Sequence, residues 1–186
     1  MRHADPPLHR FLLTILPSPE LAAQVTRSRE LLYGSIGSFS GRHTPPHITL
    51  CFLDLSETHE ADIIRAVESG VAGRAGFILH YDGITHFPDR RTIYIDPVEK
   101  QAIAAVRAPV VAALMQDVAL SPALRETDHP HLTIAAGLKP TQFEKAWEML
   151  APHEHSSAEH AGELVLLKRV LKPGERYGRV REFPLK

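Results

Sequence analysis

Two short segments of the chain repeat one pattern: proline, histidine, an aliphatic residue, threonine and a second aliphatic residue. They occupy residues 46–50 and 130–134. Side chains alternate across a β-strand, so residues two apart share one face. The histidine and threonine of each segment therefore face one side, and the two aliphatic side chains face the other. Since proline favours extended backbone in the residue before it, the pattern predicts two strands, each with an apolar face toward a core and a polar face toward a cleft.

The remaining hydrophobic patterns predict short strands alternating with helices. We expect strands at residues 11–16, 47–53, 77–81, 92–95, 131–135, 162–171 and 179–185. We expect helices at residues 18–33, from residue 56 through an apolar face at 63–67, at 97–118, and from residue 141. Strand pairs interspersed with helices are typical of an α+β domain. Each half contains one of the repeated strands followed by a capped helix, which predicts two similar lobes facing each other.

Capping residues and prolines mark where the helices begin. Ser18 followed by Pro19 and Ser56 are good starting signals. Thr141 opens a sequence typical of a capping box. Pro109 lies within the long helical stretch and should kink the helix or begin a new one.

Composition describes an ordinary globular protein without a strong charge. The 186 residues are 44% hydrophobic and 23% charged, with a net charge of −1. No apolar run approaches the roughly 20 residues that span a bilayer, and residues 1–7 lack the apolar stretch of a secretory signal. We therefore expect no membrane association. The near-neutral charge argues against a long nucleic acid as partner, and so favours contact with an end or a single linkage.

One cysteine, Cys51, cannot form an internal disulfide and lies in an apolar strand. A buried thiol in a reducing cytoplasm is the simplest interpretation. We expect one bilobal domain over residues 1–186 and a monomer.

The polar pairs His47/Thr49 and His131/Thr133 suit the chemistry of a phosphodiester at a ribose 2′ oxygen. Histidine has an ordinary pKa of about 6.5, so a neutral imidazole and an imidazolium can coexist near neutral pH. One ring can take a proton from the attacking group while the other protonates the departing ribose oxygen. The two threonine hydroxyls can donate to phosphate oxygens. This chemistry requires neither a metal nor a cofactor.

Both segments resemble the paired motifs of the 2H phosphoesterase superfamily, most closely the bacterial RNA 2′,3′-cyclic phosphodiesterase or 2′–5′ RNA ligase branch. Residues 10–12 with 16–17 resemble its opening strand, and Tyr177 with residues 183–185 resembles its closing strands. The resemblance implies two pseudo-symmetric lobes of antiparallel sheet, with outer helices and a central groove. It implies that His47 and His131 are catalytic and that Thr49 and Thr133 bind phosphate. By analogy, His131 is the base and His47 the acid in hydrolysis.

Other polar residues are candidates for substrate contact, each with an alternative interpretation. Arg42 and His43 precede the first motif, but a solvated loop is the simpler interpretation. His129 shares a strand face with His131 and either supports the site or begins the strand in solvent. Three more candidates for the groove are Arg90, Arg91 and Tyr177, the last by stacking on a base. Phe87 is better interpreted as core packing.

A metal site has weaker support, although the chain has twelve histidines. His153, His155 and His160 are best interpreted as an exposed loop, and there is no H-E-x-x-H or P-loop motif.

The resemblance implies hydrolysis of RNA 2′,3′-cyclic phosphate ends, with reversible 2′–5′ ligation. Segment 125–129 is more polar than is typical of RNA-processing members, which leaves open a small nucleotide substrate such as ADP-ribose 1″,2″-cyclic phosphate. A non-catalytic module that binds RNA ends is the alternative from another class, and a metal-dependent hydrolase comes last.

Overall fold

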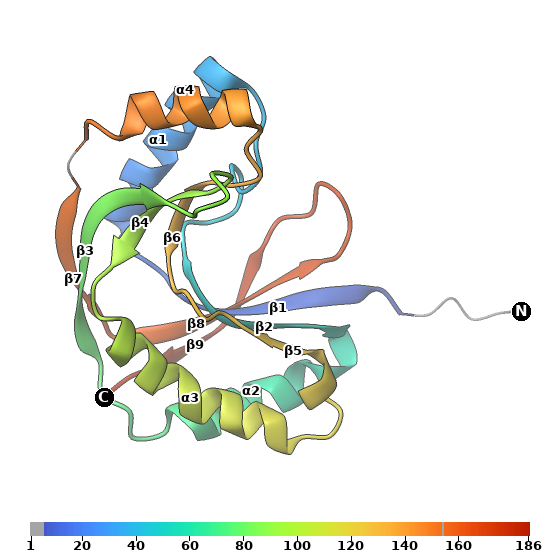
Figure 1. Cartoon of the computed structure of the whole chain (residues 1–186). Helices are drawn as coiled ribbons and strands as arrows, with labels where there is room; N and C mark the ends of the chain where they lie inside the picture. The colour runs from blue at the N-terminus through green and yellow to red at the C-terminus, as the bar shows by residue number, and fades with distance from the viewer. Residues whose placement is uncertain (1–5, 154) are drawn as a thin grey trace, which may run out of the picture.

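The structure, a computed structural model, describes residues 6–153 and 155–186 and has two lobes built on one antiparallel sheet (Figure 1). Every strand and helix expected from the sequence is present, and two short strands are added. The α+β prediction is confirmed. The expected absence of a secretory signal rests on residues 1–7, of which residues 1–5 lie outside the described part.

One lobe contains the first and last strands of the described chain and the first motif. Its strands are β1 (Leu8–Ile15), β2 (Ile48–Ser56), β5 (Leu124–Glu126), β8 (Glu163–Val170) and β9 (Gly178–Pro184). Its helices are α2 (Glu60–Val71) and α3 (Lys100–Gln116), with the 3-10 turns η1 (Glu57–His59) and η2 (Ser121–Ala123). In Figure 1 both helices lie together beneath the strands, where their apolar faces contribute to the core.

The other lobe contains the second motif. Its strands are β3 (Phe77–His86), β4 (Ile93–Pro97), β6 (Leu132–Ala135) and β7 (Ser156–Ala161). Its helices are α1 (Pro19–Ile36) and α4 (Pro140–Leu150), which pack side by side at the top of Figure 1. Each lobe therefore has its own pair of helices.

The lobes meet where the two motif strands pair. The sheet order is β7-β3-β4-β6-β2-β1-β8-β9, with β5 also on β2, and every pair is antiparallel. Strands β6 and β2 pair through Ile48 and Leu132. Both residues are fully buried in a core that contains residues of both lobes. The joint between the lobes is therefore also the place where the two motifs lie side by side.

Pro109 lies inside one continuous helix, so of its two expected effects, a kink or a new helix start, the new start is not observed. Two other local expectations need correction. Helix α4 begins at Pro140 rather than at Thr141, and Gln142 Oε1 accepts from the backbone N–H of Lys139 at 3.1 Å. Residues 156–161 form strand β7 on β3, where a loop was expected, because backbone pairing at a sheet edge tolerates polar side chains.

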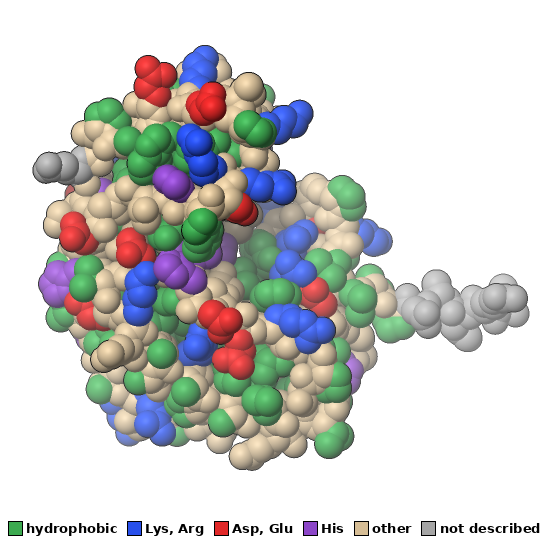
Figure 2. All heavy atoms as spheres, in the orientation of Figure 1, with side chains coloured by type: hydrophobic (Ala, Val, Ile, Leu, Met, Phe, Trp, Pro, Cys, Tyr) green, Lys and Arg blue, Asp and Glu red, His purple; other side chains and the backbone are tan. Residues whose placement is uncertain are grey.

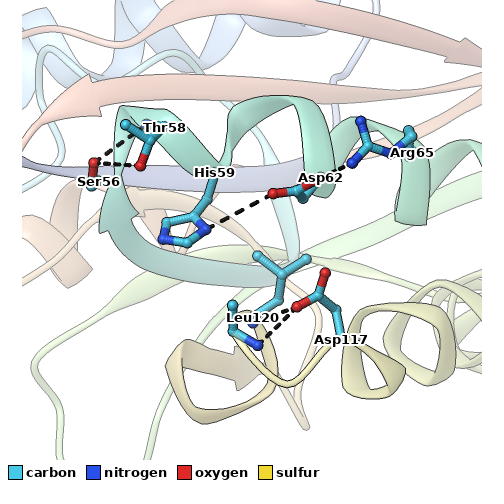
Figure 3. Close-up of polar contacts among 8 residues, drawn as sticks. Ser56, Thr58, His59, Asp62, Arg65, Asp117 and Leu120 are labelled. Atoms are coloured by element: carbon cyan, nitrogen blue, oxygen red, sulfur yellow. Dashed lines mark hydrogen bonds and ion pairs between the residues drawn. The ribbon is translucent and has the colours of Figure 1, made fainter.

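Ser56 is confirmed as the capping residue before the second helix, but the 3-10 turn η1 lies between Ser56 and α2 (Figure 3). The Ser56 hydroxyl accepts from the backbone N–H of Thr58 at 3.3 Å and caps η1, from which α2 continues. Asp62 then forms an ion pair with Arg65 one turn later. Across from it, Asp117 Oδ1 accepts from the backbone N–H of Leu120 at 3.3 Å and closes the turn after α3.

Gly70 lets α2 approach α3 closely, and its replacement is expected to destabilise the fold. A Cβ added at Gly70 would lie 2.4 Å from Val110 Cα, which is backbone and cannot move aside. We expect Gly70→Ala to lower the free energy of unfolding by about 1–3 kcal/mol, the usual range for overpacking, as measured by urea denaturation. The matched control is Gly34→Ala in α1, where nothing lies within 4 Å and alanine should stabilise by up to about 1 kcal/mol. Equal stability of the two variants would contradict this packing.

Candidate active site

The register of β2 and β6 places each histidine across from the other strand's threonine. Ile48 pairs with Leu132 in an antiparallel arrangement. Neighbours on opposite sides of such a pair also face each other, so His47 lies opposite Thr133 and Thr49 lies opposite His131. The alternation expected from the sequence is confirmed, because the aliphatic residues of both motifs are buried while these four side chains are partly exposed.

Three of these four side chains border a cleft of about 740 Å³ between the lobes. His47, Thr49 and His131 line it, whereas Thr133 is partly buried and does not belong to the lining defined by the described residues. Figure 2 shows the hollow in the middle of this face, with histidine side chains on one side and Lys and Arg side chains on the other. In the described part of the chain, neither threonine hydroxyl has a hydrogen-bond partner. The hydroxyl of Thr49, which lines the cleft, can therefore donate to a ligand there.

Both histidine rings are oriented by the same kind of hydrogen bond, from the ring to a backbone carbonyl two residues earlier. His47 Nδ1 lies 2.6 Å from the carbonyl oxygen of Pro45, and His131 Nδ1 lies 2.8 Å from that of His129. A carbonyl oxygen can only accept, so Nδ1 carries the proton and donates in each case. In the neutral ring, Nε2 is then the nitrogen that accepts a proton. Each motif thereby fixes both the orientation and the tautomer of its histidine.

The pKa of each histidine is lowered, mainly because burial disfavours the charged ring. For His47 the hydrogen bond to Pro45 opposes this shift, while the charges of Arg29 and His131 add to it. For His131 the hydrogen bond to the His129 carbonyl opposes the lowering of the pKa, while the His129 ring and Lys100 add to the lowering. Both rings are therefore biased toward the neutral form in the free protein.

An aromatic cluster holds His131 from one side. The ring of Phe87 contacts that of His131 edge-on with centroids 4.9 Å apart, and the Tyr94 ring lies 5.2 Å away. His129 Nε2 lies 3.1 Å from the Tyr94 hydroxyl and 3.3 Å from Lys100 Nζ. His129 is exposed and lies in the bend before β6, as the strand-entry interpretation has it. Its carbonyl oxygen also orients the ring of His131, so it supports the site as well. Phe87, expected in the core, is partly exposed and belongs to neither hydrophobic cluster of the described residues. Its ring packs on Tyr94, His129 and His131 instead.

The remaining candidates divide into residues at the cleft and residues away from it. His43 and Tyr177 line the cleft. Arg42 donates to Glu30 at 2.9 Å and stacks on the Tyr33 ring.

Arg90 and Arg91 line a separate depression of about 470 Å³, where Arg90 stacks over Phe143. The candidate groove position is therefore not observed for Arg90 or Arg91. Arg42 does not line the cleft either, which agrees with the simpler interpretation of it as a loop charge. The sequence gives no means of telling on which side of the β3–β4 turn a side chain lies.

Several residues that sequence reasoning missed lie at the site. Arg10, Phe52, Arg169 and Arg176 line the cleft. Arg10 forms an ion pair with Asp54, whereas no acidic partner is found for Arg169 or Arg176 within the described ranges.

Arg29 of α1 lies behind both motifs and is almost completely buried. A sequence signal existed for it, since Arg29 falls on the buried stripe of α1 with Leu21, Val25 and Leu32. Leu31 of the same helix lies outside that stripe and is 68% exposed.

Cys51 is confirmed as a buried free thiol, and its burial raises its pKa to about 12. Among the residues that the structure describes, no group of three or more His, Cys, Asp or Glu side chains is arranged to hold a metal ion. None of the helices in those ranges is both long and apolar enough to cross a bilayer.

Comparisons with known proteins agree with this architecture. No curated protein sequence matches the chain with significance. The fold is similar to TT0787 of Thermus thermophilus, with a TM-score of 0.67 and 18% identity over 95% of this chain and 97% of that one. It is also similar to LigT of E. coli complexed with 3′-AMP, with a TM-score of 0.64 and 15% identity over 96% of this chain and 98% of LigT.

The sequence model of the 2′-5′ RNA ligase superfamily matches residues 17–172. The matched range includes both motifs and most of the cleft wall. The chain belongs to the 2′-5′ RNA ligase superfamily.

Proposed function

We propose that this protein is a metal-independent phosphodiesterase that hydrolyses the 2′,3′-cyclic phosphate ends of RNA. The same site carries out reversible 2′–5′ ligation, in which a 5′ hydroxyl takes the place of water as the nucleophile. The observation that carries the proposal is that His47 and His131 have the same hydrogen bond, the same tautomer and the same position at the cleft. Each donates Nδ1–H to a carbonyl two residues earlier and has Nε2 available at one cleft. Family membership supports phosphoester chemistry, and the opposed pairs supply the two proton carriers and two hydroxyl donors that it needs.

In hydrolysis, one neutral imidazole takes a proton from water as the water oxygen bonds to phosphorus. The other histidine, as an imidazolium, protonates the departing ribose oxygen as its bond to phosphorus breaks. That oxygen is O3′ when the phosphate stays on O2′, which a 2′–5′ linkage requires. Thr49 and Thr133 donate to the non-bridging oxygens as their negative charge grows. Following the family resemblance, we assign His131 as the base and His47 as the acid.

The cleft lining favours an RNA end over a small nucleotide. Arg169 and Arg176 can pair with phosphates, since they have no acidic partner in the described ranges. Tyr177 is half-buried in the cleft and offers a ring on which a base can stack. The net charge of −1 favours the alternative, a small nucleotide such as ADP-ribose 1″,2″-cyclic phosphate. LigT has been crystallised with both 3′-AMP and NADP+.

A panel of substrates in excess chelator tests the proposal. It compares an RNA oligonucleotide with a 2′,3′-cyclic phosphate end, a nucleoside 2′,3′-cyclic phosphate and ADP-ribose 1″,2″-cyclic phosphate. We expect the oligonucleotide to have the highest kcat/KM. Preferential turnover of the ADP-ribose compound would establish the alternative substrate. Binding of the RNA end without turnover would instead indicate a binding module.

The pH dependence of catalysis follows from the lowered pKa of both histidines. The base acts when neutral, above its pKa, and the acid acts when protonated, below its own. With both values lowered, the bell-shaped kcat/KM profile of the free enzyme should have its maximum below about pH 6.5. A bound phosphate anion favours both imidazolium forms, so the kcat profile should move to higher pH. Initial rates across the acid and neutral ranges test this, and a kcat/KM that keeps rising above neutral pH would contradict it.

A further inference from the structure

Arg29 is a charged side chain in a place where an apolar one would be expected. It lies in the middle of α1 on the buried stripe of that helix, and only 3% of its surface is exposed. Burying an arginine is costly unless its donors are paired. The hydrogen bonds of Arg29 therefore indicate what it does.

The guanidinium donates to three backbone carbonyls, one in the loop just before the first motif segment and two in the second motif segment. Its Nη1 lies 2.5 Å from the carbonyl oxygen of Thr44, in the loop before His47. Its Nη2 lies 2.8 Å from the carbonyl oxygen of Thr133, and its Nε lies 3.1 Å from that of Ile134. One side chain thus joins the first segment to the second.

The three contacts lie next to the groups that carry the chemistry. Thr44 is bonded to Pro45, whose carbonyl orients the ring of His47. Thr133 is itself one of the four polar motif residues and lies opposite His47 in the register. A shift of the guanidinium would therefore change both the orientation of His47 and its spacing from Thr133.

No carboxylate compensates the charge of Arg29 within the described residues, since all three partners are carbonyl oxygens. Burial lowers its pKa to about 10, which still leaves it protonated at neutral pH. A positive charge fixed behind the cleft disfavours an imidazolium at His47 and favours an anion in the cleft.

We propose that Arg29 is a positioning residue that holds the two H-x-T segments at their working separation and supplies the fixed positive charge behind His47. The proposal rests on the proposed phosphodiesterase function. Arg29 does not line the cleft and so acts through the backbone and the field rather than by touching substrate. The fork of five donors in arginine suits three divergent carbonyls, which the single ammonium of lysine cannot match.

Other charged or titratable groups also face His47 and contribute to the electrostatic field at its ring. His131 lies across the strand pair, and His43 lies in the preceding loop. The wall formed by β1 and β8 contributes Arg10 and Arg169. The β8–β9 loop contributes Glu175, Arg176 and Tyr177. None of these is altered in the experiment below.

The experiment compares Arg29→Lys and Arg29→Met with matched changes at Arg27, an exposed arginine of the same helix. Turnover of a nucleoside 2′,3′-cyclic phosphate gives kcat and KM, and NMR follows the titration of His47. We expect Arg29→Lys to keep the low pKa of His47, because the charge remains. Its kcat should fall about 10²-fold, the cost of a small misplacement of reacting groups, with KM less affected. Arg29→Met should lower kcat at least as much and raise the pKa of His47. The Arg27 variants should match wild type.

Two results would overturn the proposal. One is a folded Arg29→Lys protein with wild-type kcat, which decides the matter even if Arg29→Met does not fold. The other is an Arg29→Met protein in which the pKa of His47 is unchanged and kcat falls only as far as the unfolded fraction explains. Thermal melting measures that unfolded fraction. If wild type itself turns over no cyclic phosphate, the proposed function fails separately. In that case the pKa of His47, measured in wild type and in Arg29→Met with and without inorganic phosphate, still tests the role of the Arg29 charge.

Discussion

Replacing either His47 or His131 with alanine is expected to lower kcat for a 2′,3′-cyclic phosphate by roughly 10²–10⁴-fold, the usual contribution of one general acid or base. Each variant removes one of the two proton carriers, and the remaining histidine cannot both accept and donate in one step. Rapid-quench or steady-state product assays measure the loss.

The double variant should be only slightly slower than the slower single variant, because residues that act as a unit are not additive. The matched control is His153→Ala, an exposed histidine between α4 and β7, which should retain wild-type kcat. Full activity in either single variant would remove the proposed mechanism. A strictly additive double variant would indicate two independent contributions rather than one coupled proton transfer.

Replacing Thr49 or Thr133 with valine is expected to lower kcat by about 10²-fold, near the lower end of the cost of removing one donor to a developing oxyanion. Valine preserves the shape and removes the hydroxyl, which has no partner in the described structure. The loss should appear more in kcat than in KM, because the charge on the phosphate oxygens grows in the transition state.

Serine at the same positions provides the control, since Thr49→Ser and Thr133→Ser keep a hydroxyl. They should retain most of the activity that the valine variants lose. If serine and valine reduce kcat equally, packing of the methyl group and not hydrogen bonding explains the effect. An effect on KM alone would mean that the hydroxyls bind substrate and transition state equally.

The motif strands were predictable because their information is local. Alternation places His47 and Thr49 on one face, and the burial of Ile48 and Leu50 agrees with it. The family resemblance added the expectation that both motifs share one groove. The pairing of Ile48 with Leu132, which connects them, joins residues far apart in the sequence, and alternation alone does not specify it.

The parts that were missed depend on contacts between distant segments. Strand β7 is polar and is held by its pairing with β3, so its own residues carry little strand signal. Arg29 was detectable as a charge on an apolar stripe, but its partners Thr44 and Thr133 follow from the three-dimensional arrangement. Arg90 seemed close to the groove in sequence, yet it stacks on Phe143 of α4.

The proposed function requires that His47 and His131 form one metal-independent site for cyclic phosphodiesters. The most direct measurement is product formation from an RNA oligonucleotide with a 2′,3′-cyclic phosphate end, in excess chelator, by wild type and by His47→Ala. We expect wild type to open the cyclic phosphate at the same rate with and without chelator, and His47→Ala to be slower by at least about 10²-fold. Loss of wild-type activity in chelator, or equal rates for the two proteins, would contradict the proposed function.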